Sequence, residues 1–123
     1  MFNRQMIKGL RPETPVRVVS WAPDEIPATD LDLSGADVIV ADSLLAQHPE
    51  ALRTVQEEHP AASLVLLVHY LRCIDPQATN AATAADERAT LGVVDAAITT
   101  SRFVRRALVD EGLSAKRIKV VRP

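Results

Sequence analysis

Short runs of apolar residues recur along the chain, and each is separated from the next by a longer segment of mixed polarity. The runs consist largely of valine, isoleucine, leucine and alanine, which is typical of strands buried on both faces of a parallel sheet. They predict five strands, at residues 16–20, 37–41, 64–68, 95–99 and 118–121.

The segments between the runs carry apolar residues at helical spacing or have high helix propensity. They predict helices near residues 2–10, 49–60, 78–92 and 101–111. In the last helix one apolar face is formed by Phe103, Val104, Ala107 and Leu108. The alternation of strands and helices predicts an α/β fold, with a Rossmann-like parallel sheet of about five strands and helices on both faces.

The length of 123 residues fits a single domain that spans residues 1–123. A net charge of −2 argues against the broad positive field that drives nucleic-acid binding, so we expect no nucleic-acid partner. Cys73 is the only cysteine, and the sequence contains neither a signal peptide nor a membrane-spanning apolar run. These features predict a cytoplasmic protein.

Polar side chains follow three of the predicted strands, at the point where each strand ends. They are Asp42 and Ser43 after the second strand, His69, Tyr70 and Arg72 after the third, and Ser101 after the fourth. The carboxyl ends of parallel strands meet at one edge of a sheet, and ligands bind in the crevice beyond that edge. The sequence therefore predicts a binding site there.

Each of these residues also has an ordinary structural interpretation. His69 can hydrogen-bond to neighbouring backbone, and Ser101 can cap the helix that follows it. Asp42 and Ser43 are common turn residues. The arginines of residues 101–111 more often form a solvated helix face than a surface for anionic lipid.

Sequence signatures of other chemistries are absent. The four glycines are scattered, so no glycine-rich loop can bind a phosphate, and we expect no cofactor in this domain. The three histidines, His48, His59 and His69, lack the spacing of a metal site. We therefore expect no metal, and we interpret Cys73 as a packed side chain.

Four pieces of the sequence follow one another in a recognisable order. They are DVIVADS at 37–43, LVLLVHYLRC at 64–73, DERATLGVVDAAITTSRFVRRALVDEGL at 86–113 and RIKVVRP at 117–123. In this order they resemble the N-terminal half of family-four retaining glycosyltransferases, enzymes built from two facing Rossmann-like domains. Residues 2–10 resemble the first helix of that family, and residues 16–23 resemble its second strand.

The resemblance implies that this domain is the acceptor-side half of a hexosyltransferase, which transfers a sugar from a nucleotide-sugar donor to a hydroxyl acceptor with retention. It implies that His69 lies at the interdomain cleft near the transferred sugar, as the catalytic residue. Tyr70 and Arg72 would shape a pocket for a carbohydrate or lipid-linked acceptor. The strand-end residues Ser43 and Ser101 are further substrate-binding candidates.

The sequence departs from the pattern of the family at both ends. The usual first strand and its glycine-rich loop are missing, which would expose strand edges and could support a homodimer. The C-terminal domain that binds the nucleotide-sugar donor is also missing from the sequence. We therefore expect this chain to be inactive alone and to act as part of a longer chain or with a second chain.

The sequence leaves three further points open. The chain could instead be a non-catalytic Rossmann-like binding or regulatory module, which its short length and missing phosphate loop favour. Peripheral contact with a membrane is compatible with the sequence. Glu87 matches a glutamate that related sequences often carry, but it could equally be a surface helix residue.

Overall fold

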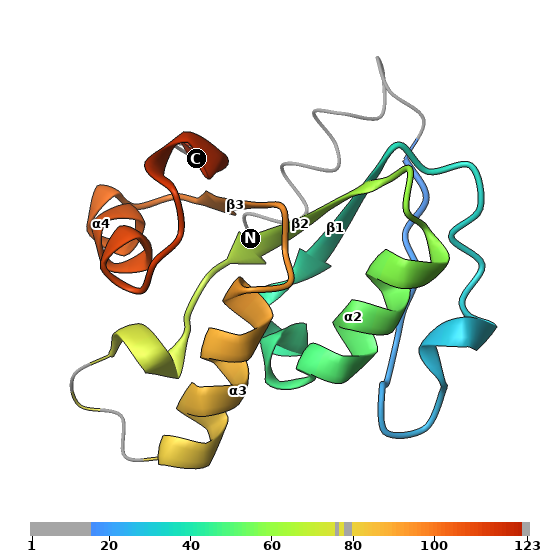
Figure 1. Ribbon diagram of the computed structural model, residues 1–123, viewed down its shortest axis with the longest axis horizontal. Helices are drawn as coiled ribbons and strands as arrows, with labels where there is room; N and C mark the ends of the chain where they lie inside the picture. Colours follow the sequence, from blue (N-terminus) through green and yellow to red (C-terminus); the bar gives the residue numbers. More distant parts are fainter. Residues whose placement is uncertain (1–15, 76, 78–79, 122–123) are drawn as a thin grey trace.

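The computed structural model describes residues 16–75, 77 and 80–121, which form a parallel sheet with helices packed against it (Figure 1). The strands are β1 (Val38–Asp42), β2 (Ser63–Val68), β3 (Ala96–Thr99) and β4 (Ile118–Val120). Neighbouring strands are parallel, in the order β1-β2-β3-β4. The predicted α/β class with a Rossmann-like sheet is confirmed, and four of the predicted strands end within one residue of their expected bounds.

A helix lies in each connection between successive strands. These helices are α2 (Pro49–Glu58), α3 (Ala81–Leu91) and α4 (Arg102–Asp110), and short 3-10 helices are present at η1 (Ala28–Asp30), η2 (Ser43–Gln47), η3 (Arg72–Ile74) and η4 (Ala115–Arg117). Pro49 begins α2 at a position where a missing N–H costs no hydrogen bond. Within the described ranges no helix is both long and apolar enough to cross a bilayer.

The core lies between the three helices and one face of the sheet. Side chains alternate along a strand, so Leu64, Leu66 and Val68 point to the same face of β2. They share one buried cluster with residues from all three helices, including Leu52, Leu91 and Leu108. Burial of one leucine side chain contributes about 1.5–3 kcal/mol, so this cluster holds the helices on the sheet. The helix predicted over residues 2–10 lies outside the described residues.

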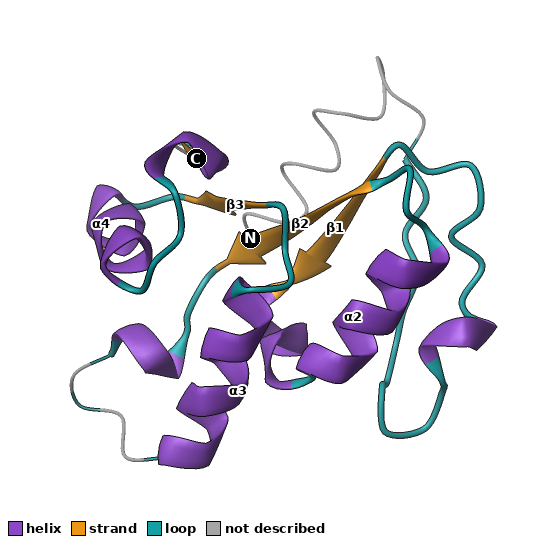
Figure 2. Ribbon diagram, in the orientation of Figure 1, coloured by secondary structure: helices purple, strands orange, loops and turns teal. Residues whose placement is uncertain are grey.

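The strand predicted at residues 16–20 does not form. These residues pair with none of the described strands, and Val18 is 58% exposed. Figure 2 shows that the chain between residue 16 and β1 is loop apart from the short turn η1. A strand needs a neighbour to satisfy its backbone N–H and C=O groups, and apolar character alone does not provide one.

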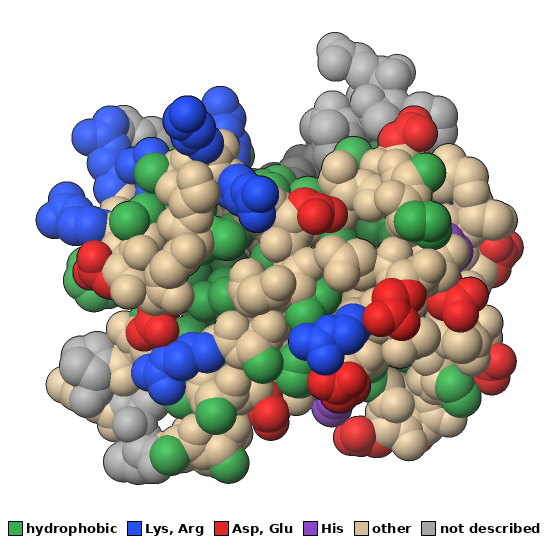
Figure 3. All heavy atoms as spheres, viewed as in Figure 1, with side chains coloured by type: hydrophobic (Ala, Val, Ile, Leu, Met, Phe, Trp, Pro, Cys, Tyr) green, Lys and Arg blue, Asp and Glu red, His purple; other side chains and the backbone are tan. Residues whose placement is uncertain are grey.

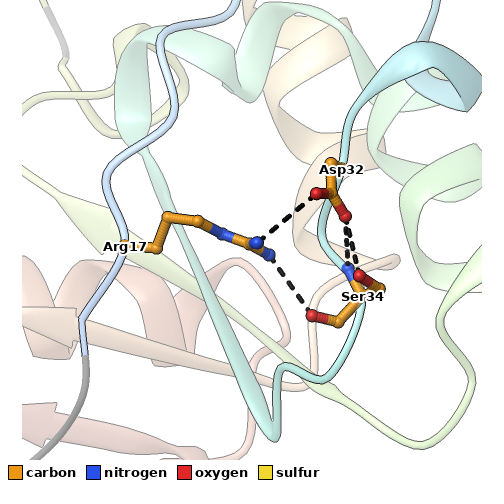
Figure 4. A network of polar contacts seen from close by, with 3 residues as sticks. All are labelled: Arg17, Asp32 and Ser34. Carbon is orange, nitrogen blue, oxygen red and sulfur yellow. Dashed lines mark hydrogen bonds and ion pairs between the residues drawn. The ribbon is translucent and has the colours of Figure 1, made fainter.

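Arg17 attaches this N-terminal segment to the loop that precedes β1 (Figure 4). Its Nη1 lies 3.5 Å from Oδ2 of Asp32, and its Nη2 donates a hydrogen bond to the carbonyl oxygen of Ser34 at 3.3 Å. The hydroxyl and the backbone N–H of Ser34 both donate to Asp32. These two hydrogen bonds, together with the nearby Arg17 charge, lower the pKa of Asp32 below its usual value.

The register of the sheet aligns the carboxyl ends of neighbouring strands. Asp42, the last residue of β1, pairs with Leu67 of β2. Val68, the last residue of β2, pairs with Thr99, the last residue of β3. The residues that follow β1, β2 and β3 therefore lie at one edge of the sheet, called here the carboxyl edge.

Candidate functional site

An aspartate and a histidine meet at the carboxyl edge. Asp42 ends β1, and His69 directly follows β2, which is the neighbouring strand. The Nε2 atom of His69 lies 3.4 Å from Oδ2 of Asp42, and both side chains are partly exposed. A carboxylate at this distance orients the imidazole ring and forms an ion pair with it when the ring is protonated.

The backbone on both sides of this pair is fixed by side-chain hydrogen bonds. The other carboxylate oxygen of Asp42, Oδ1, accepts the backbone N–H of Leu44 at 2.9 Å and so caps η2. The buried Ser43 hydroxyl accepts the backbone N–H of His69 at 3.1 Å. The structure therefore brings Ser43 and His69 together, as expected, and Ser43 joins the exit of β1 to the exit of β2.

Ser101 follows the third strand end and has the role of a helix cap. Its Oγ accepts the backbone N–H of Val104 at 3.3 Å, at the start of α4. Its own N–H donates to the hydroxyl oxygen of Thr99 at 3.4 Å. The interpretation of Ser101 as a helix cap is thus confirmed. A contact between Ser101 and a substrate stays a prediction.

Tyr70 forms a hydrogen bond within the loop that follows β2. Its hydroxyl donates to Oδ2 of Asp75 at 2.6 Å, while the residue as a whole is 52% exposed. This hydrogen bond is the main cause of two opposite effects: the pKa of Tyr70 is raised and the pKa of Asp75 is lowered. Tyr70 therefore keeps its proton at neutral pH and presents an aromatic surface beside His69.

Arg72 lies in η3, next to an open cavity of about 490 Å³ between η3, α3 and α4. Its lining includes Arg72, Cys73, Asp75 and Arg88, but none of the residues His69, Ser43 or Ser101. The structure thus gives two adjacent regions, the His69–Asp42 pair at the carboxyl edge and a charged cavity beside it. The predicted site residues do not line one common pocket.

Glu87 is buried in α3, with only 2% of its surface exposed, so the idea of a surface helix residue is wrong. Its Oε1 accepts the backbone N–H of Cys73 at 2.9 Å. Glu87 therefore holds η3, which includes Arg72 and follows Tyr70, against α3. Helical spacing from Glu87 to the buried residues Thr90 and Leu91, three and four positions later, is the sequence signal for this burial.

Cys73 is buried, in agreement with its interpretation as a packed side chain. Burial, with a smaller contribution from the negative charge of Glu87, raises the pKa of its thiol to about 11. The thiol is therefore protonated at neutral pH and is a poor nucleophile. In the part of the chain that the structure describes, no three His, Cys, Asp or Glu side chains gather into a possible metal site.

Large apolar side chains are exposed after three successive strands. Leu44 follows β1 and is 78% exposed, Tyr70 follows β2, and Phe103 follows β3 and is 68% exposed. The prediction that Phe103 belongs to the inward face of its helix is wrong, because α4 packs through Val104 and Leu108. Exposed apolar side chains around a polar centre are typical of a binding surface.

Comparisons of the chain with protein-family models, with curated proteins and with solved structures found no match.

Proposed function

We propose that this domain binds the acceptor in a retaining glycosyltransferase, which moves a sugar from a nucleotide-sugar donor to a hydroxyl group. The observation that supports this proposal most strongly is the pair formed by His69 and Asp42 at the carboxyl ends of neighbouring strands. In open parallel sheets this edge is where ligands bind. The pair also lies in the two sequence pieces that resemble the transferase family.

The pair offers the polar groups that a carbohydrate requires. Sugar hydroxyls both donate and accept hydrogen bonds, and a carboxylate beside an imidazole can serve both functions. In the transfer step His69 would donate a hydrogen bond to the transferred sugar or to the charge that develops on the leaving group, and Asp42 would orient it. His69 need not act as a base in this scheme.

The exposed apolar residues at the carboxyl edge suit the same function. Aromatic side chains commonly line ligand sites, where a few polar groups fix the orientation of the ligand. Tyr70 would pack against the acceptor or against a facing domain. A donor-binding domain, in a longer chain or on a second chain, would hold the nucleotide sugar and exclude water when it closes over this edge.

Acceptor binding is tested by NMR titration of the isotope-labelled chain. The probes are methyl glycosides of glucose, galactose, mannose and N-acetylglucosamine, with UDP-glucose as a donor probe. At least one glycoside should shift the backbone amides of residues 42–44 and 69–73, whereas UDP-glucose should not. His69→Ala should abolish these shifts, and the matched variant His59→Ala, at the end of α2, should retain them.

Several results would argue against the proposal. If no glycoside shifts these amides, or if His69→Ala binds as well as the wild type, the carboxyl edge is not an acceptor site. In an assembly that joins this domain to a donor-binding domain, an unchanged transfer rate for His69→Ala would refute the catalytic role. Glycoside binding without transfer in such an assembly would instead favour a non-catalytic binding module.

A further inference from the structure

Exposed cations gather on one side of the molecule. They come from α4, η4 and β4, and they are Arg102, Arg105, Arg106, Lys116, Arg117 and Lys119, which together are called here the basic surface. Figure 3 shows Lys and Arg side chains concentrated over α4 and the neighbouring C-terminal segment, while Asp and Glu side chains predominate over the opposite side of the same view.

This concentration of positive charge contrasts with the negative net charge of the whole chain. Residues 102–119 contain six Lys or Arg and only two Asp or Glu, whereas the whole chain has a net charge of −2. One of those two acids, Glu111, is already paired with Arg88 at 2.9 Å. Among the described residues no carboxylate lies within 4.0 Å of a cation of the basic surface.

The packing of α4 against the core places its arginines together on the solvent-exposed side of the helix. Leu108 is fully buried and Val104 packs against the core, which turns the opposite side of the helix to solvent. Arg102 and Arg106 are four residues apart and therefore lie on one face of the helix. Arg105 donates a hydrogen bond from Nη2 to the carbonyl oxygen of Ala115 at 3.4 Å, which connects α4 to the cations of η4.

Apolar groups accompany the cations on the exposed side of α4. Phe103 and Val109 are both exposed large hydrophobic residues. Phe103 adjoins Arg102 in the sequence, and Val109 is three residues after Arg106, which places these two side chains on the same face of the helix. Helices that lie at a membrane surface combine basic residues with a bulky apolar residue that enters the boundary between headgroups and acyl chains. A nucleic acid would use the cations equally well and could stack a base on Phe103, but the net charge of −2 argues against the broad positive field that drives nucleic-acid binding.

We infer that the basic surface docks on an anionic lipid bilayer, with the arginines facing the headgroups and Phe103 at the boundary with the acyl chains. The inference rests on charge complementarity and on the exposed phenylalanine, and it does not depend on the proposed function. Each basic residue near an anionic bilayer strengthens binding roughly fivefold, so six of them are enough for reversible attachment.

Vesicle sedimentation tests the inference. The wild-type chain should sediment with vesicles of phosphatidylcholine and phosphatidylserine, but not with vesicles of phosphatidylcholine alone. The double variant Arg102→Gln, Arg106→Gln should bind roughly twenty-five-fold more weakly, because it loses two contacts of about fivefold each. The matched double variant Arg17→Gln, Arg53→Gln removes the same charge elsewhere on the surface and should bind within about twofold of the wild type.

A second variant separates lipid docking from simple attraction of opposite charges. Phe103→Ala keeps every charge and should still weaken binding several-fold, with the larger relative loss at high salt, where electrostatic attraction is screened. The inference fails if the anionic vesicles bind nothing, or if the two double variants lose affinity equally. It also fails if duplex DNA is bound while the anionic vesicles are not, since the partner would then be a nucleic acid.

Discussion

Thr90 offers a sharp test of how the scaffold supports the carboxyl edge. It lies in α3, is fully buried, and donates a hydrogen bond from Oγ1 to the carbonyl oxygen of Ala46 at 2.6 Å. Ala46 belongs to η2, the turn that begins at Ser43 directly after Asp42. Thr90→Val replaces the hydroxyl by a methyl group of similar size, so it removes the hydrogen bond with little change in packing.

The size of the effect follows from the burial of both partners. Without the donor, the carbonyl of Ala46 has no access to water, and a buried polar group left without a partner costs about 1–3 kcal/mol. Thr90→Ser keeps the hydroxyl and removes one methyl group, which costs about 0.8 kcal/mol. We therefore expect Thr90→Val to lower the free energy of unfolding by about 2 kcal/mol, which is more than Thr90→Ser does. Threonine, valine and serine have similar helix propensities, so the comparison isolates the hydrogen bond.

The measurement is urea unfolding of the three proteins, followed by far-ultraviolet circular dichroism and fitted with a common dependence on urea. Thermal unfolding provides a second estimate, because 1 kcal/mol shifts Tm by about 4 °C in a chain of this size. A valine variant as stable as the wild type would show that the contact between α3 and η2 contributes nothing. A serine variant that is less stable than the valine variant would also refute the reasoning.

Three further predictions concern single side chains. The Cys73 thiol should react slowly with a disulfide reagent at pH 8 in the folded protein and rapidly in urea. Because its folded pKa of about 11 lies above the usual 9.0, its contribution to stability is intact below pH 9 and is lost as the pH rises toward 11. Cys73→Ala should therefore show a smaller loss of unfolding free energy than the wild type over that pH range. Ser101→Ala should lower the free energy of unfolding by about 1 kcal/mol through loss of the cap on α4, whereas Ser101→Asp should restore it; equal values for the alanine and aspartate variants would contradict the cap. Leu66→Ala should cost about 2–5 kcal/mol in urea unfolding, and a cost below 1 kcal/mol would show that β2 is not the centre of the core.

Much of the sheet was predictable because its strands are short apolar runs that end at polar residues. Helix ends were predictable where backbone chemistry dictates them, as at Pro49 in the first turn of α2 and at Gly112, whose φ is 105°. Residues 16–20 were predicted wrongly because their apolar character is local information. A strand also needs a neighbouring strand to pair with, and in the described part of the sheet β1 is the edge strand, with residues 16–20 unpaired.

The candidate site was predictable to a similar degree. The proximity of Ser43, His69 and Asp42 follows once their strands are neighbours in a parallel sheet, and alternating strands and helices favour that order. Phe103 was misplaced because helical spacing allows two adjacent apolar stripes on α4, and only packing against β3 and β4 selects the stripe through Val104 and Leu108. The hydrogen bond from Tyr70 to Asp75 depends on the path of a loop, which spacing does not predict.

The central claim is that His69 and Asp42 act as one unit in binding an acceptor. The direct test is a double-mutant cycle on the affinity for the glycoside that shifts residues 42–44 and 69–73 most strongly. The variants are His69→Gln, Asp42→Asn and the double variant; asparagine retains an oxygen that can accept the N–H of Leu44 and so preserves the cap of η2. We predict a coupling of at least about 0.5 kcal/mol, with the double variant little weaker than either single variant. Strictly additive losses, or affinities that none of the substitutions changes, would contradict the claim.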